Sequence, residues 1–184
     1  MSQLKAGQAA PHFSTLDVNG KPISLSDYVG KTVWLIFHRN VGCPICNLRF
    51  YELEKHQAEL QANGIVVLSV YESSAANMRQ YLDGRPQPYS RMIPDPTEQL
   101  YRLYGVERSF GKLLSGVMLH GGIGKLKASK KLTAKLPKQD GHADRMGAEL
   151  LIGPDGRICR AHYHRFLGDD LPLTEIRDAG KVFS

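Results

Sequence analysis

The chain has 184 residues, of which 42% are hydrophobic, and its formal net charge is +6. This length and composition predict a single compact domain over residues 1–184, built around one core. No segment reaches the roughly 18–20 consecutive apolar residues of a membrane span, and the first residues lack the basic-then-apolar layout of a secretory signal.

The chain contains only three cysteines, which are Cys43, Cys46 and Cys159. An odd number of cysteines without a secretory signal argues against a secreted, disulfide-stapled scaffold. We therefore expect a protein of the reducing cytoplasm, where a C-x-x-C pair is usually catalytic or metal-binding.

The first predicted elements are a hairpin, a strand and a long helix. Residues 11–31 contain an Asn-Gly pair between two extended runs, which is a strong hairpin signal. The continuous apolar run over 32–38 predicts a buried central strand. Residues 44–62 predict a helix, with proline in its first turn and Asn-Gly after its end.

The middle of the chain continues the alternation of strands and helices. Residues 65–71 predict a second buried strand. Residues 73–84 begin with cap-type serines and end in glycine, which indicates a short helix. Residues 91–106 predict a short strand and then a helix that begins after Pro96 and stops at Gly105.

Residues 107–140 form a basic insertion that is expected to be largely irregular, with a helix starting near 113–118. Its core is the run 124–138, which carries six lysines and no acid. Such a run suits an acidic partner, an anionic membrane surface or nucleic acid, although a solvated loop or helix face is the ordinary interpretation. The chain has no zinc-finger, RNA-binding or helix-turn-helix signature, so we expect no nucleic-acid partner.

The chain closes with a second hairpin over 145–164, turning at Pro-Asp-Gly, and a helix over 173–179. Strands that alternate with helices predict an α/β fold, with a mostly parallel sheet covered by helices on both faces and the closing hairpin adding antiparallel strands. The C-x-x-C then lies at the carboxyl end of the central strand, where ligands bind in such sheets.

Cys43 is expected at the N-terminus of the helix that begins near Pro44. Unpaired N–H groups and the helix dipole favour a thiolate there, and His38 and Arg39 are expected to add positive charge. Cys46 follows one helical turn later and gains less from the helix end. The spacing therefore predicts Cys43 as the attacking sulfur and Cys46 as the resolving one.

Two other interpretations of the pair remain open at this point. A zinc site needs four ligands, and Cys159, His162 and His164 are the remaining candidates, although Cys159 would point away from the two histidines on a strand. The two cysteines could also be small buried side chains without a chemical role. The position at a helix start after a buried strand favours the redox interpretation.

Three further segments resemble a known family. "APHFSTLDVNGKPISLSD", "PDPTEQLYRLYGV" and "GAELLIGPDGRI" occur in the order and spacing of the peroxiredoxin superfamily, the alkyl hydroperoxide reductase and thiol-specific antioxidant group. The G-C-P-x-C loop and the long insertion resemble its peroxiredoxin-like subgroup. The resemblance implies a thioredoxin-like fold, with a central mixed sheet, helices on both faces and an N-terminal hairpin extension.

The chain departs from the pattern of typical members at three positions. Asn40 stands where the resemblance places a Thr or Ser, Ile36 where it places a Pro, and Gly147 where it places an Arg; the thioredoxin cis-proline would fall at the same place as this Arg. Arg39 and Arg145 are the candidates to supply the missing positive charge. Peroxide reduction is accordingly expected to be slower than in a typical member.

The resemblance implies a thiol-dependent peroxidase in which Cys43, Cys46, Arg39, Asn40 and Arg145 form the site. It implies no metal, flavin or nucleotide cofactor, a peroxide or disulfide substrate, and an external dithiol reductant such as a thioredoxin-type protein. It leaves oligomer formation open. The alternatives are a thiol–disulfide oxidoreductase of thioredoxin type and a redox-sensing binding protein that docks through its basic insertion.

Overall fold

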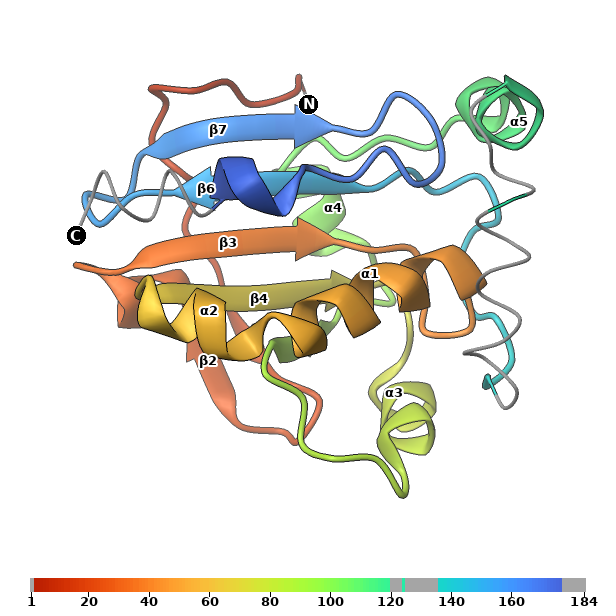
Figure 1. Cartoon of the computed structure of the whole chain (residues 1–184), viewed down its shortest axis with the longest axis horizontal. Helices are drawn as coiled ribbons and strands as arrows, with labels where there is room; N and C mark the ends of the chain where they lie inside the picture. The colour runs from red at the N-terminus through yellow and green to blue at the C-terminus, as the bar shows by residue number, and fades with distance from the viewer. Residues whose placement is uncertain (1, 120–123, 125–135, 177–184) are drawn as a thin grey trace.

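A computed structural model gives the fold and describes residues 2–119, 124 and 136–176 (Figure 1). Its centre is a five-stranded sheet in the order β5-β4-β3-β6-β7. The β3–β4 and β4–β5 pairs are parallel, and the β3–β6 and β6–β7 pairs are antiparallel. The strands are β3 (Thr32–Phe37), β4 (Ile65–Tyr71), β5 (Arg91–Pro94), β6 (Ala148–Ile152) and β7 (Ile158–Tyr163). The predicted mixed sheet is thus confirmed.

Helices lie on both faces of this sheet, as predicted. They are α1 (Pro44–Lys55), α2 (Gln57–Ala62), α3 (Ala75–Leu82), α4 (Gln99–Leu103) and α5 (Phe110–Leu119). In Figure 1, α1 and α2 cross the front of the sheet and α4 lies behind it. Residues 173–176 are also helical, and the rest of the predicted final helix falls outside the described residues.

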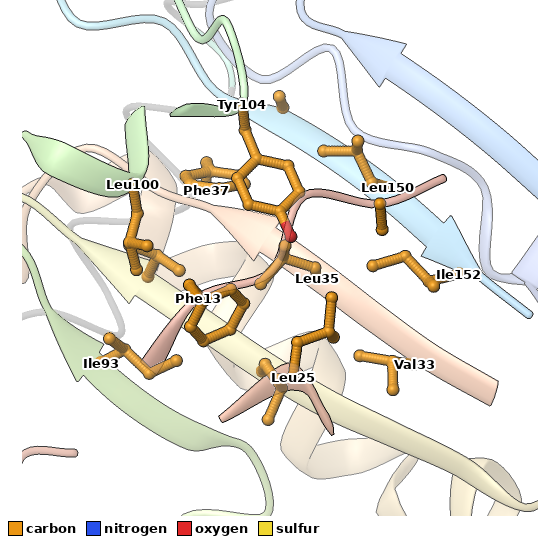
Figure 2. Packing of buried hydrophobic residues seen from close by; sticks show 14 of the residues in the cluster. Phe13, Leu25, Val33, Leu35, Phe37, Ile93, Leu100, Tyr104, Leu150 and Ile152 are labelled. Carbon is orange, nitrogen blue, oxygen red and sulfur yellow. The ribbon is translucent and has the colours of Figure 1, made fainter. Parts of the chain in front are cut away.

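The alternation of side chains along β3 divides the core into two parts. Val33, Leu35 and Phe37 point to one face, where they pack with the N-terminal hairpin and α4 (Figure 2). Trp34 and Ile36 point to the other face and pack against α1 and α2. All six residues of β3 are buried, because helices or loops cover both faces of the central strand.

The N-terminal hairpin consists of β1 (Ser14–Leu16) and β2 (Pro22–Ser24), which pair antiparallel as a separate two-stranded sheet. Its connection is longer than a two-residue Asn-Gly turn. The Asp17 carboxylate accepts hydrogen bonds from the backbone N–H groups of Asn19 and Lys21, both at 2.9 Å, and so closes a wider loop. The predicted hairpin is therefore present with a different turn.

The helix predicted over 44–62 is interrupted at His56. The backbone of His56 has φ −102° and ψ 13°, outside the helical region, so α1 ends before it and α2 begins after it. The short helix predicted over 73–84 is confirmed as α3, and the Ser74 side chain accepts from the N–H of Asn77 at 3.2 Å.

Helix α4 begins later than the sequence predicts. Glu98 adopts a left-handed conformation with φ +59°, which delays the helix to Gln99. The buried Asp95 carboxylate then caps the helix, accepting from the N–H groups of Gln99 at 2.9 Å and Leu100 at 2.8 Å. A carboxylate that satisfies N–H groups at a helix start replaces the intrahelical bonds they lack.

The basic insertion is more ordered at its start than expected. Helix α5 begins at Phe110, before the predicted 113–118, and most of the lysine run lies outside the described residues. Figure 1 shows α5 beyond the same end of the sheet as the start of α1. Within the part of the chain that the structure describes, no helix combines the length and apolar character needed to cross a bilayer.

The capping of α4 predicts the effect of Asp95→Ala. Losing the carboxylate leaves buried N–H groups without an acceptor, so the free energy of unfolding should fall by about 1–3 kcal/mol. Urea unfolding followed by circular dichroism measures this change. Asp83→Ala, at an exposed position, is the control and should change stability by less than about 0.5 kcal/mol. Equal stabilities of the two variants would contradict the capping role.

Candidate active site

The loop between β3 and α1 brings both cysteines into the protein interior. The backbone N–H of Cys43 donates to the carbonyl of Asn40 at 3.0 Å, which turns the chain into the helix. Cys43 is the N-cap of α1, and Pro44 is its first residue, as predicted. The side chain of Cys43 is only 1% exposed and that of Cys46 is 9% exposed.

Side-chain hydrogen bonds hold this loop in place. The Asn47 amide donates to the carbonyls of Val41 at 2.9 Å and Cys43 at 2.8 Å. The N–H of Val41 donates to the Ser73 hydroxyl at 3.0 Å, and that hydroxyl donates to Asp140 at 2.6 Å. Three segments distant in sequence therefore fix the position of the thiol.

The pKa of the Cys43 thiol is lowered to about 6. The main cause is a hydrogen bond from the Cys46 side chain, with further stabilisation from the charge of Arg39 and from the backbone N–H groups at the helix start, while burial opposes the shift. A thiol with this pKa is about 90% thiolate at pH 7, against a few per cent for an ordinary cysteine.

The Cys46 thiol shifts in the opposite direction. Its hydrogen bond to Cys43, its burial and the neighbouring negative charge raise its pKa well above the ordinary value. Cys46 is therefore a protonated donor when Cys43 is a thiolate. This asymmetry matches the expected roles of attacking and resolving sulfur.

Arg39 is the cation at the thiolate. One guanidinium nitrogen lies 3.7 Å from the Cys43 sulfur, and the other donates to the carbonyl of Ala143. Arg39 is buried together with the sulfur. Its charge therefore acts on Cys43 in surroundings that water screens weakly.

His38 does not add the positive charge that the sequence suggested. Burial lowers its pKa to about 3, so the ring is neutral at physiological pH. The imidazole stacks on Tyr71 with ring centroids 4.5 Å apart. The prediction for His38 was wrong because a fully buried imidazole loses the hydration that favours its charged form.

Arg145 lies in a different set of contacts from those expected of a substrate-binding arginine. Its guanidinium donates to the carboxylates of Glu72 and Glu98, both at 2.5 Å, and to the carbonyl of Val106 at 2.9 Å. It also stacks over the Tyr101 ring at 4.6 Å. These contacts give Arg145 a role in holding the turn before α4.

Asn40 and Gly147 occupy the positions at which the chain departs from typical relatives. Asn40 is 1% exposed, and its buried Oδ1 has no hydrogen-bond partner among the described residues. A Cβ atom at Gly147 would lie 2.6 Å from Nδ1 of His164. The imidazole of His164 thus occupies the space beside Gly147 that a side chain there would need.

Part of the insertion covers the active loop. Leu113 of α5 packs against a cluster of Cys43, Ile45, Cys46 and Leu167. A Cβ atom at Gly42 would lie 2.6 Å from the carbonyl oxygen of Pro137, which shows how closely that segment approaches the loop. A substrate therefore reaches Cys43 only if these covering residues separate.

The zinc site considered for the cysteines is not assembled in the described part of the chain. His162 and His164 do lie close together, with ring centroids 5.6 Å apart. The two clusters there with metal-ligand geometry are Glu72–Glu98–His142 and Glu149–His164–Asp170, and neither contains a cysteine. Cys159 is half-buried on β7, and burial raises the pKa of its thiol.

Several polar residues that shape the site were missed in the sequence. Asn47 and Ser73 contact the loop backbone, and Asp140 accepts from the Ser73 hydroxyl; no local spacing reveals these contacts. Glu149 is the exception, because a charged residue inside the apolar run "AELLI" is unusual for a buried strand.

The fold and the site define a thioredoxin-like protein with a buried, activated thiol. The chain belongs to the AhpC/TSA family, whose model matches residues 6–126. It is 28% identical over 120 residues to "Peroxiredoxin Bcp" of Escherichia coli (strain K12), covering 64% of this chain and 76% of that protein. The predicted superfamily is therefore confirmed.

Solved structures show the same fold over nearly the whole chain. The peroxidoxin BcpB of Mycobacterium tuberculosis superposes with a TM-score of 0.68 at 14% identity, covering 97% of this chain and 96% of that one. The thioredoxin domain of a thiol-disulfide oxidoreductase from Bacteroides vulgatus gives a TM-score of 0.60 at 16% identity, covering 98% and 99%. These similarities confirm the thioredoxin-like fold.

The cause assigned to the low pKa of Cys43 predicts how two substitutions of Cys46 differ. Cys46→Ser keeps an O–H donor for the thiolate, whereas Cys46→Ala removes it, so the alanine variant should have the higher Cys43 pKa. The pH dependence of iodoacetamide labelling, with peptide mapping to Cys43, measures this pKa, which should be about 6 in the wild type. Identical pKa values in the two variants would show that Arg39 and the helix start dominate.

Proposed function

We propose that the protein is a thiol-dependent peroxidase in which Cys43 reacts with the peroxide and Cys46 resolves the product. The observation that carries this proposal is the buried pair of thiols at the start of α1, one activated and one protonated, with Arg39 at 3.7 Å from the reactive sulfur. Membership of the AhpC/TSA family and the similarity to a peroxiredoxin support the peroxide as substrate.

In the first step the Cys43 thiolate attacks one oxygen of the hydroperoxide. A sulfur–oxygen bond forms, the oxygen–oxygen bond breaks, and an alkoxide or hydroxide leaves and takes up a proton. The product is a sulfenic acid on Cys43. The roughly 90% thiolate content at pH 7 means that little activation is needed before the attack.

Arg39 and Asn40 supply the polar groups that this step needs. The Arg39 charge stabilises the negative charge that develops on the leaving oxygen, as donors do at other buried reaction centres. The unpartnered Oδ1 of Asn40 is an acceptor that suits the O–H of a hydroperoxide. Asn40 then takes the part of the Thr or Ser of typical relatives.

In the second step Cys46 attacks the sulfenic sulfur and forms a Cys43–Cys46 disulfide. An external dithiol, such as a thioredoxin-type protein, restores both thiols by exchange. A reducing compartment such as the cytoplasm provides such dithiols. The burial of both sulfurs requires that the covering residues of α5 and the 137–139 segment separate before the reductant can reach the disulfide.

Cys43→Ser should abolish peroxide turnover, because a serine hydroxyl is not ionised at neutral pH. Wild-type protein treated with one equivalent of hydrogen peroxide should lose two thiols and contain a Cys43–Cys46 disulfide within one chain. Non-reducing peptide mapping identifies the bond. A dominant Cys43–Cys159 bond would contradict the role of Cys46, and reduction of a protein disulfide without peroxide turnover would favour the thioredoxin-type alternative.

Arg39→Met should lower peroxidase activity, whereas Arg145→Met should lower the stability of the fold. Losing the cation at the thiolate should reduce kcat/KM for hydrogen peroxide by about 10²–10³. Losing Arg145 leaves the buried Glu72 without its arginine partner, so the free energy of unfolding should fall by about 3–5 kcal/mol. Peroxidase kinetics and urea unfolding measure the two effects. Arg108→Met, at an arginine 44% exposed, is the control and should change neither; an Arg145→Met enzyme that is stable but inactive would reassign the role.

A further inference from the structure

A small cavity of about 20 Å³ borders Cys46. The residues that line it include Cys46, His38, His164 and Arg49. Its volume suits one water molecule, which needs polar partners of the kind these side chains provide. Cys46 borders this cavity together with Arg39, the cation that also lies 3.7 Å from the Cys43 sulfur.

Glu149 anchors a buried ionic network on the far side of the cavity. It is 0% exposed, and its Oε2 accepts from Arg49 at 2.8 Å and from the Trp34 indole at 3.0 Å. Its Oε1 accepts from the N–H of Leu171 at 3.2 Å and lies 3.6 Å from Nε2 of His164. Although burial opposes ionisation, Arg49 and His164 lower the pKa of Glu149 to about 2, so the carboxylate is charged.

The ring of His164 is oriented between this carboxylate and the cavity. Nε2 faces Glu149 and, within the described part of the chain, has no closer hydrogen-bond partner. The opposite edge, with Nδ1, packs on Gly147, which also lines the cavity. If Nε2 carries the proton toward Glu149, Nδ1 is the basic nitrogen on the cavity side.

His38 borders the same cavity but is a poor proton acceptor. Its pKa is lowered to about 3 by burial, and its ring stacks on Tyr71. A base that works near neutral pH needs a pKa close to that pH. Of the two cavity histidines, His164 is the one whose Nε2 lies 3.6 Å from a carboxylate oxygen of Glu149.

We propose that His164 accepts the proton of Cys46 during disulfide formation, through one water molecule in this cavity, and that Glu149 positions the His164 ring and stabilises its cationic form. The inference rests on the proposed function, because it concerns the second step of that reaction. It gives a role to a buried Glu–His pair whose desolvation would otherwise only weaken the fold.

The chemistry of this step balances without another reactant. His164 takes the proton from Cys46, and the Cys46 thiolate then donates an electron pair to the sulfenic sulfur of Cys43. The sulfur–sulfur bond forms, the sulfur–oxygen bond breaks, and hydroxide leaves. Return of the proton from His164 gives water, so the Cys43 sulfur is reduced and the Cys46 sulfur is oxidised.

The charged and titratable groups around His164 come from several elements. They are Cys46 and Arg49 of α1, His38 after β3, Glu149 of β6, His162 of β7, and Asp170. Any pH dependence of the step reflects this whole set. The first experiment therefore compares variants at one pH.

The test separates the two steps in time. Reduced protein is mixed rapidly with one equivalent of hydrogen peroxide and quenched with dimedone, which traps sulfenic acid, or with an alkylating agent, and the products are quantified by peptide mapping. His164→Gln should leave sulfenic acid formation unchanged and slow disulfide formation at pH 7 by about 10²-fold, the usual contribution of a general base.

His162→Gln is the matched control, because its ring lies 5.6 Å from His164 but binds the carbonyl of Asp169 outside the cavity. It should form the disulfide at the wild-type rate. Three results would overturn the proposal. His164→Gln could form the disulfide at the wild-type rate, or His162→Gln could slow disulfide formation as much as His164→Gln does. The third is that His164→Gln slows sulfenic acid formation and disulfide formation equally. Absence of sulfenic acid in the wild type would instead overturn the proposed function.

A second measurement needs no substitution of the network. In the wild-type protein the rate of disulfide formation should rise with pH and reach half of its plateau at the titration midpoint of His164, measured by nuclear magnetic resonance of its ring nitrogens. The rate rises because only the neutral ring accepts a proton. If the pH dependence of disulfide formation does not follow the titration of His164, the proposal is overturned, even if His164→Gln fails to fold.

Discussion

A buried thiolate must be stabilised by the protein itself, because water cannot reach it. Cys43 is 1% exposed, and its charge depends on the Cys46 thiol, on Arg39 and on the N–H groups at the start of α1. Each of these groups must be held in place before the thiol ionises. The loop contacts of Asn47 and Ser73 serve this requirement by fixing the backbone around the sulfur.

The central sheet brings together the two halves of this arrangement. Strand β3 carries the loop with Arg39 and Cys43 at its carboxyl end, and it pairs with β6, which carries Glu149. One side of Cys46 thus faces the reactive sulfur, and the other faces a cavity bordered by a buried histidine. Arg39, which stabilises the Cys43 thiolate, and His164, which we propose as the base for Cys46, therefore border the same cavity.

Much of the fold could be predicted from local sequence patterns. The wrong helix boundaries fall where one residue leaves the helical conformation. The apolar runs gave β3, β4 and the closing hairpin, because burial on both faces leaves a clear signal. The predicted long helix breaks at His56, and α4 starts after Glu98, whose left-handed conformation accompanies its ion pair with Arg145. Helix propensity is a local property and cannot predict such a long-range contact.

Hydrophobic runs, proline and spacing are local properties, so they are enough to predict that two cysteines one turn apart begin a helix after a buried strand. Which charges act on these cysteines depends on long-range packing. Arg39 and Arg145 are equally basic in the sequence, but one contacts the thiol and the other pairs with Glu72. His38 is neutral because burial, which depends on the whole fold, removes the water that would stabilise its charge.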